Sequence, residues 1–248
     1  MESPGNGNLR KYIDEAIGLG IFMFSAGFFD GLLEYPGLPF RHQLDSALLR
    51  RSLVGLSMGL TGLYIFTSRF GRQSGAYINP AITVIRYFLK DINRKDGVFY
   101  ILFQCIGGSV GMYLVVLLFP RWMTYPDVNY IVTVPGKAGV AMAFAMEFLI
   151  AFILIVVVLL MEHRVSLEKY TPWVVSCLIA LFITVEAPFS GMSMNPARTF
   201  SSAIVAGQWR DFWLYCVAPL TGMGAGLGVL SLFKGIRGTR FVRNNTVD

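Results

Sequence analysis

The chain has few charged residues and few of the side chains on which thiol or metal chemistry depends. Of its 248 residues, 15% are charged and 54% are hydrophobic. This balance is too apolar for a typical soluble domain and indicates a polytopic membrane protein. The three cysteines lie within apolar runs and the two histidines in connecting segments. We therefore expect no disulfide framework, no metal centre and no cofactor, and no convergent catalytic set that would make the protein an enzyme.

The basic residues are better explained by membrane topology than by a nucleic-acid partner. The net charge is +6, but the lysines and arginines lie at the ends of apolar segments, and no basic-aromatic surface motif is present. Lys and Arg concentrate on the cytoplasmic side of membrane proteins. Fourteen of them fall on the side that holds both termini and seven on the other side. We expect both termini in the cytoplasm, no nucleic-acid binding, and a location in the plasma (cell inner) membrane.

One stretch of the sequence occurs twice. Ser-Gly-x-x-x-Asn-Pro-Ala-x-Thr covers residues 74–83 and recurs at residues 190–199, 116 positions later. Asn before Pro is typical of a helix N-cap followed by the first helical position, where Pro needs no N–H. Each copy therefore predicts a helix start, with helices over residues 80–89 and 196–206. Some ten residues rise only ~15 Å, about half of a ~30 Å hydrocarbon core, so both are predicted as half-helices.

Six longer apolar segments accompany these half-helices. The predicted spans cover residues 12–34, 52–68, 98–120, 138–161, 170–185 and 212–233. Each half of the chain holds three spans and one half-helix, and an odd number of spans inverts the second half relative to the first. The predicted fold is an all-α membrane protein, with six transmembrane helices and two re-entrant half-helices in an inverted repeat. Non-helical backbone at the depth of the membrane core is tolerated only where protein buries it or water lines it, which implies an aqueous path.

The predicted domain organisation is simple. A single channel domain covers residues 12–234, with a first repeat at about 12–120 and a second at about 138–234. A cytoplasmic tail is expected at residues 1–11, and a basic cytoplasmic tail at residues 235–248.

These features resemble the aquaporin (major intrinsic protein) family over nearly the whole chain. The resemblance rests on the two Asn-Pro-Ala stretches, on Arg198 after the second, and on Glu15 and Glu147 in equivalent spans. It implies six tilted helices around a pore, with the half-helices meeting inside. It also implies a homotetramer with one pore per subunit in the lipid bilayer.

The resemblance assigns roles to particular residues. The pore motifs are Asn79, Pro80 and Ala81, and Asn195, Pro196 and Ala197. The two asparagine side chains are expected to donate hydrogen bonds to a passing water molecule and so to interrupt a proton wire, while the positive half-helix ends disfavour cations. Arg198 is expected at an outer constriction. Glu15 and Glu147 are expected to accept bonds from loop backbone N–H groups, the alternative being a proton relay.

The outer filter departs from that of strictly water-selective members, which usually place an aromatic residue and a His beside the arginine. Here the resemblance places Ile183, Met192 and either Gly59 or Met58 there. Such a filter is more apolar, and wider if Gly59 lines it. Thr199 stands where glycerol-conducting members usually have Asp. We expect passive water conduction along osmotic gradients with exclusion of protons and ions. The alternatives are a broader channel for glycerol, urea, ammonia or hydrogen peroxide, and a coupled secondary transporter.

Overall fold

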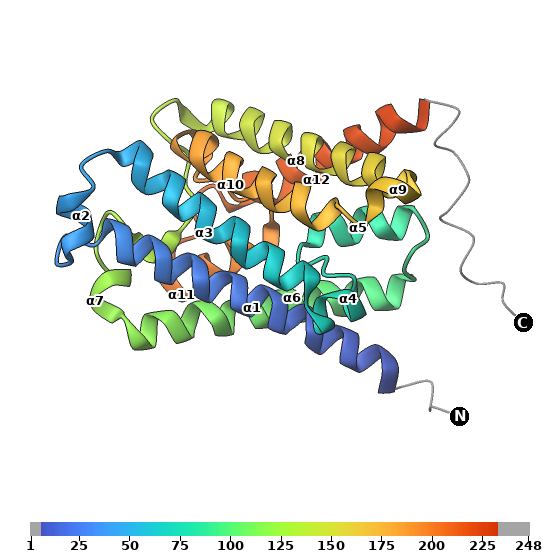
Figure 1. Cartoon of the computed structure of the whole chain (residues 1–248), viewed down its shortest axis with the longest axis horizontal. Coiled ribbons are helices and arrows are strands. Elements are labelled where there is room, and N and C mark those ends of the chain that lie inside the picture. Colours follow the sequence, from blue (N-terminus) through green and yellow to red (C-terminus); the bar gives the residue numbers. More distant parts are fainter. Residues whose placement is uncertain (1–5, 233–248) are drawn as a thin grey trace, which may run out of the picture.

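The computed structural model describes residues 6–232, which form a bundle of long helices aligned along one axis (Figure 1). The long helices are α1 (Asn6–Glu34), α3 (Ala47–Thr67), α6 (Arg94–Leu118), α8 (Gly139–His163), α10 (Thr171–Ser190) and α12 (Phe212–Leu232). Two shorter helices, α5 (Pro80–Phe88) and α11 (Pro196–Ala206), begin inside the bundle. The connections hold α2 (Pro39–Gln43), α4 (Arg69–Ser74), α7 (Pro120–Met123), η1 (Asn129–Ile131) and α9 (Val165–Glu168). The basic tail expected at 235–248 lies outside the described residues.

Five of the long helices in the described part of the chain are long and apolar enough to cross a membrane, namely α1, α6, α8, α10 and α12. The sixth, α3, has 21 residues but carries Arg50 and Arg51 near its start and several small polar residues, which lower its mean hydropathy. α5 and α11 have only 9 and 11 residues, too few to span. The predicted all-α membrane fold is confirmed.

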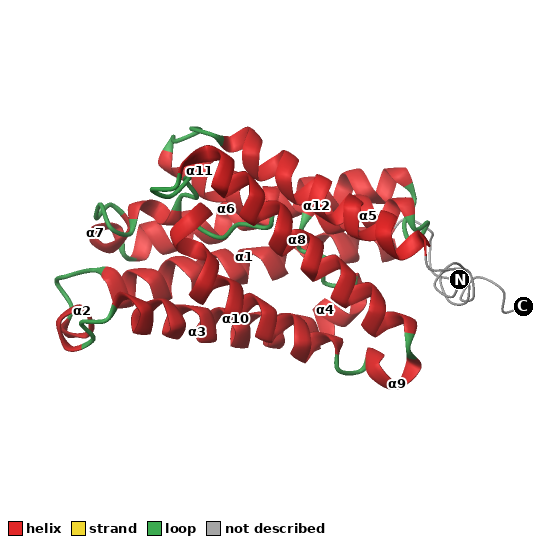
Figure 2. Ribbon diagram, turned by 90° about the horizontal axis from the view of Figure 1, so that it is seen from above, coloured by secondary structure: helices red, strands yellow, loops and turns green. Residues whose placement is uncertain are grey.

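The two halves pack as inverted counterparts of each other. α1 packs on α6 as α8 packs on α12, and α3 packs directly on α10. Each half-helix packs on the last long helix of the other half, α5 on α12 and α11 on α6. The half-helices lie toward opposite ends of the bundle in both views (Figures 1 and 2). The non-helical stretches that precede them are thereby brought together in the interior.

Glycines allow the closest helix contacts, at equivalent places in the two halves. A Cβ atom at Gly107 of α6 would lie 2.0 Å from the carbonyl oxygen of Ala16 on α1. One at Gly222 of α12 would lie 2.3 Å from the carbonyl oxygen of Phe148 on α8. No larger residue fits without moving the backbones apart, as in other close membrane helix pairs.

Four helix ends differ from the sequence prediction by four residues or more. α3 begins at Ala47 instead of residue 52 and α6 at Arg94 instead of residue 98, so both helices include the charged residues before the apolar run. α1 begins at Asn6, inside the tail expected at residues 1–11, because Asn8 and Tyr12 both donate to Asp96 Oδ1 at the start of α6 and hold the extra turns in place. α10 continues past residue 185 to Ser190, with a proline in its last turn. It ends where Gly191 takes a left-handed conformation with φ of 82° and its N–H bonds to the carbonyl of Ala187.

Candidate functional site: a pore where the half-helices meet

Both half-helices begin at a capped asparagine inside the bundle. Asn79 has an extended backbone, and its Oδ1 accepts from the backbone N–H of Ala81 at 2.9 Å. Asn195 Oδ1 accepts from Ala197 N at 3.0 Å and from Arg198 N at 3.2 Å. Proline follows each asparagine at the first helical position, where its missing N–H costs nothing. The side-chain oxygens are therefore used in capping the helices, and the amide nitrogens are left to donate hydrogen bonds to other groups.

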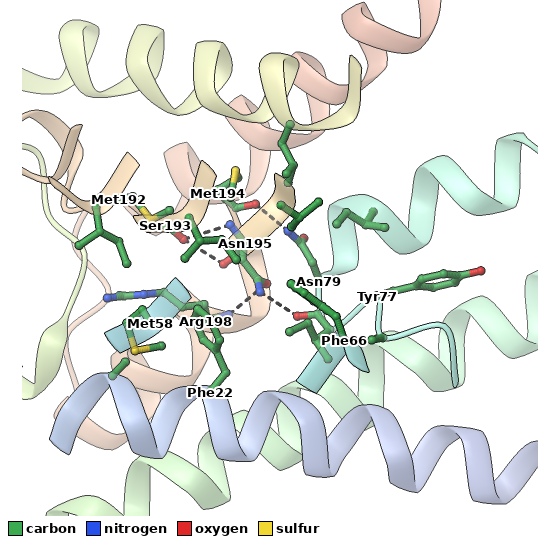
Figure 3. Close-up of a pocket in the computed structure, with 18 of the residues that line it drawn as sticks. Phe22, Met58, Phe66, Tyr77, Asn79, Met192, Ser193, Met194, Asn195 and Arg198 are labelled. Atoms are coloured by element: carbon green, nitrogen blue, oxygen red, sulfur yellow. Dashed lines mark hydrogen bonds between the residues drawn. The ribbon is translucent and has the colours of Figure 1, made fainter. Parts of the chain in front are cut away.

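Each asparagine amide nitrogen reaches across to the loop of the other half. Asn79 Nδ2 donates to the carbonyl oxygen of Met194 at 2.8 Å, and Asn195 Nδ2 donates to that of Ile78 at 2.8 Å (Figure 3). An amide nitrogen carries two N–H donors, and each of these bonds uses one. Both asparagines line the same cavity. Each therefore has a second N–H available to a molecule in that cavity.

The loops before the half-helices have the same unusual backbone in both halves. Positive φ angles occur at Gly75, Ala76 and Ile78 in the first half, and at Gly191, Met192 and Met194 in the second. A left-handed conformation is unfavourable for residues other than glycine, above all for a β-branched one such as Ile78. The surrounding structure must hold these loops in place.

Two buried glutamates supply that support. Glu15 Oε1 accepts from Tyr77 N at 3.0 Å, and its Oε2 accepts from Ile78 N at 2.6 Å. In the second half, Glu147 Oε1 accepts from Ser193 N at 2.7 Å and its Oε2 from Met194 N at 2.6 Å. Both side chains are fully buried, and neither lines the main cavity. Their position favours a structural role over a proton relay.

A single cavity of about 570 Å³ runs past the paired asparagines. At one end it is lined by residues of α1, α3 and the segment before η1, including Asp30, Glu34, Arg51 and Asp127. At the other end it is lined by Arg72, Tyr77, Arg86, Glu162 and Thr171. The cavity thus connects the two ends of the bundle through the point where the half-helices meet.

Arg198 lies in the half of this cavity that Asp30 and Asp127 line, next to the asparagine pair. It is half-buried, and its Nη1 donates to the carbonyl oxygen of Ile131 at 2.7 Å. Figure 3 shows its side chain between Met58 and Met192, with Phe22 close by. The remaining guanidinium donors can bond to a molecule in the cavity.

The structure distinguishes the two candidates for the filter position on α3. Met58 lines the cavity, whereas Gly59 does not: a Cβ at Gly59 would lie 2.7 Å from the carbonyl oxygen of Ser176. Gly59 therefore faces α10 in a close helix contact. Ile183 and Met192 both line the cavity. The walls around Arg198 are thus apolar and are narrowed by the methionine rather than widened by the glycine.

Several cavity residues were not anticipated from the sequence. Phe22 and Phe66 add aromatic rings to the wall on either side of the asparagines. Asp30 lines the same end of the cavity as Arg198 and lies close enough to interact with it electrostatically. Among the described residues Asp30 has no ion-pair partner, whereas neighbouring Glu34 pairs with Arg50 at 2.9 Å. The available signal for Asp30 was an acidic residue inside a predicted membrane span.

The end of the main cavity farther from Arg198 is lined by a cluster of ion pairs. Arg86, at the end of α5, donates to both oxygens of Glu162 on α8, at 2.8 and 2.6 Å, and to Asp91 at 3.2 Å. Its guanidinium also lies over the Tyr77 ring, 5.4 Å from the centroid. Burial raises the pKa of Asp91 above its usual range, while Arg86 acts in the opposite direction. This cluster joins the first half-helix to the second half of the chain.

Comparison with known proteins agrees with this architecture. The family model "Major intrinsic protein" matches residues 3–231. The chain is 32% identical to "Probable aquaporin TIP2-2" of Oryza sativa subsp. japonica, over 89% of this chain and 86% of that protein. It is 30% identical to aquaporin-4 of Bos taurus over 68% of its length, and the match spans about half, 52%, of that relative.

A solved structure shares the fold. The X-ray structure of the aquaglyceroporin from Plasmodium falciparum superposes with a TM-score of 0.75, covering 89% of this chain and 94% of that one. The two sequences are only 20% identical, so this likeness concerns the fold.

Proposed function

The chain belongs to the major intrinsic protein family, and we propose that it is a passive channel that conducts water along osmotic gradients and excludes protons and ions. The observation that carries the proposal is the pair of asparagine amides in the cavity, each with one N–H committed to the opposite loop and one free. A water molecule that accepts from both cannot also continue a chain of donors and acceptors through the pore. The positive ends of α5 and α11 meet at the same place and disfavour a cation there.

The residues around Arg198 strengthen the repulsion that its charge exerts on cations in the proposed filter. Its charge lies in a cavity with low polarity around it, formed by Met58, Ile183 and Met192. A charge in such surroundings acts over a longer range than in water. The proposed filter is therefore one strong donor in an apolar ring, which water can pass by bonding to the arginine and to the carbonyl oxygens of the loops.

A second candidate is a broader channel for small neutral solutes such as glycerol, urea, ammonia or hydrogen peroxide. The apolar side chain of Ile183, at the position where the family's water-selective members usually have His, favours it. The apolar wall can contact the carbon chain of a polyol while the arginine donates hydrogen bonds to its hydroxyl groups. The presence of Met58 rather than Gly59 in the wall limits the width and favours water.

The test is stopped-flow light scattering on proteoliposomes, with an impermeant sugar and with glycerol as separate osmolytes. We expect fast shrinkage with a low activation energy in sugar and no rapid re-swelling in glycerol. Rapid re-swelling would establish the second candidate in place of the first. If neither gradient produces acceleration over empty liposomes, the proposal of an open channel is wrong. A pH-sensitive dye inside the vesicles measures the proton exclusion in the same preparation.

We further propose a homotetramer in the plasma membrane with both termini in the cytoplasm. The distribution of Lys and Arg supports this orientation, since the end of the bundle with α4 and α9 is the richer in basic residues. Protease protection of a C-terminal tag in sealed cells tests the orientation. Cross-linking followed by mass measurement tests the oligomer.

A further inference from the structure

A second cavity, separate from the pore, opens at the end of the bundle where α1 and α6 begin and α5 ends (Figure 1). Its volume is about 740 Å³. Its walls come from the first turns of α1, the segment between α5 and α6, and the first turns of α6. Nothing in the proposed channel function uses this cavity.

The side chains that line the cavity carry a net positive charge, because three cations stand against the two carboxylates of Asp91 and Asp96. Lys11, Lys90 and Arg94 line it, and none of them has a hydrogen-bond or ion-pair partner among the residues that the structure describes. Both carboxylates line the cavity, and both already accept hydrogen bonds. Asp91 accepts from Arg86, and Asp96 accepts from Asn8, Tyr12 and Asn93, the last at 2.7 Å. Three free cations therefore face one space whose acidic neighbours already have donors.

The polar groups around these cations suit an anion with several acceptor oxygens. Asn8 and Asn93 line the same cavity, so amide donors stand beside the ammonium and guanidinium groups. Arg presents a planar fork of donors and Lys a point charge, and both bind phosphate. The two non-bridging oxygens of a phosphodiester share a negative charge and can accept hydrogen bonds from several of these donors at once.

The surroundings indicate a phosphate that belongs to a lipid. Large apolar side chains on the same three segments are exposed: Phe88 is 66% exposed, Val98 59% and Ile13 43%. Tyr87 also lines the cavity and is 44% exposed, and exposed tyrosines of this kind are typical of the membrane interface. The cavity thus lies where a cationic edge adjoins a surface that faces acyl chains.

We propose that this cavity binds the phosphate of an anionic phospholipid, held by Lys11, Lys90 and Arg94, with the acyl chains against the exposed apolar surface of α1 and α6. A free phosphate ion offers the same head chemistry without the chains. The two sources differ in one respect that can be measured, because only the lipid gains affinity from the apolar surface.

The experiment is a native mass spectrometry titration of the detergent-solubilised full chain. The probes are dioleoyl phosphatidylglycerol, dioleoyl phosphatidylcholine and inorganic phosphate. We expect phosphatidylglycerol to bind at least about ten-fold more tightly than phosphatidylcholine, since each basic residue near an anionic head contributes appreciably. Inorganic phosphate at millimolar concentration should neither bind comparably nor displace the lipid.

A matched pair of triple variants identifies the site. Lys11→Gln, Lys90→Gln and Arg94→Gln together should weaken phosphatidylglycerol binding by about ten-fold or more. The control carries Arg69→Gln, Arg164→Gln and Lys169→Gln, which remove the same charge from exposed positions at the same end of the bundle, beside α4 and α9. It should bind as the unmodified chain does. Thermal unfolding midpoints of all three proteins establish that each is folded.

Three results would overturn the proposal. Equal affinity for the two lipids would mean that no anionic site exists. Equal loss in both triple variants would mean that only the overall charge of this end matters. Displacement of the lipid by millimolar inorganic phosphate would assign the cavity to soluble phosphate instead.

Discussion

Replacing Glu147 by Gln should loosen the loop that carries the second asparagine of the pore. The carboxylate accepts three short bonds, from Ser190 Oγ at 2.6 Å, Ser193 N at 2.7 Å and Met194 N at 2.6 Å. Glutamine has one oxygen, so it can serve the first two donors only. Its NH₂ group would then face the N–H of Met194, and that donor would be buried without an acceptor.

The size of the effect follows from these three bonds. A buried N–H left without an acceptor costs about 1–3 kcal/mol. The two bonds that remain lose their charge assistance, at about 0.5–1 kcal/mol each. The sum is about 3 kcal/mol, which lowers the unfolding midpoint of a domain of this size by about 6–12 °C. Because Met194 O receives the amide of Asn79, the displacement should also lower water conduction.

The chain offers a matched control in Glu186, a second buried glutamate in the same half. Its side chain is 1% exposed, and neither carboxyl oxygen has a hydrogen bond of normal geometry from any residue that the structure describes. Glu186→Gln therefore removes no such bond and should leave the midpoint unchanged or raise it. The assays are thermal unfolding in detergent, followed by tryptophan fluorescence, and stopped-flow shrinkage of proteoliposomes. The reasoning is refuted if Glu147→Gln unfolds within about 2 °C of the unmodified chain, or if Glu186→Gln loses as much.

Three further substitutions test separate parts of the structure. Arg198→Val removes the charge from the apolar filter and should raise proton and cation leak by about ten-fold or more, measured with a pH-sensitive dye; unchanged leak would assign ion exclusion to the asparagines alone. Asp30→Asn removes an unpaired carboxylate near Arg198, which attracts cations to the cavity, so it should lower residual cation leak and keep water conduction within about two-fold. An increased leak would contradict the idea that Asp30 attracts cations. Gly111→Leu inserts a side chain where 2.1 Å is available and should cost about 3 kcal/mol or prevent assembly, seen as loss of monodisperse protein; a stable variant would show that α1 and α6 can move apart.

The architecture could be predicted from the sequence because the decisive signal is local and repeated. Asn-Pro fixes a cap and a first helical residue wherever it occurs in a helix-forming run, and two copies at one spacing define the half-helices. Segment hydropathy adds the long helices. The end of α10 was missed because a proline near the C-terminus of a membrane helix is tolerated when the packing around it holds the last turn.

The walls of the pore could be predicted less completely, because they depend on how each helix is rotated. Neighbouring residues on a helix point about 100° apart, so the spacing left Met58 and Gly59 as alternatives. The contact between Gly59 and the backbone of α10 distinguishes them, and it exists only in the packed bundle. The ion pair between Arg86 and Glu162 joins residues 76 positions apart, and no pattern in either segment indicates it.

The exchange of amide hydrogen bonds between the halves means that each half fixes the position of an asparagine in the other. Asn79 is held by a carbonyl of the second half and Asn195 by a carbonyl of the first. Neither asparagine can take its position until the opposite loop is present, so the two loops order together. The same two bonds would form between two identical half-length chains packed head to head. An unbroken peptide link between α6 and α8 then serves to keep the partners at high effective concentration. Cutting it at one position, with every residue retained, should yield two fragments that reassemble into a working pore.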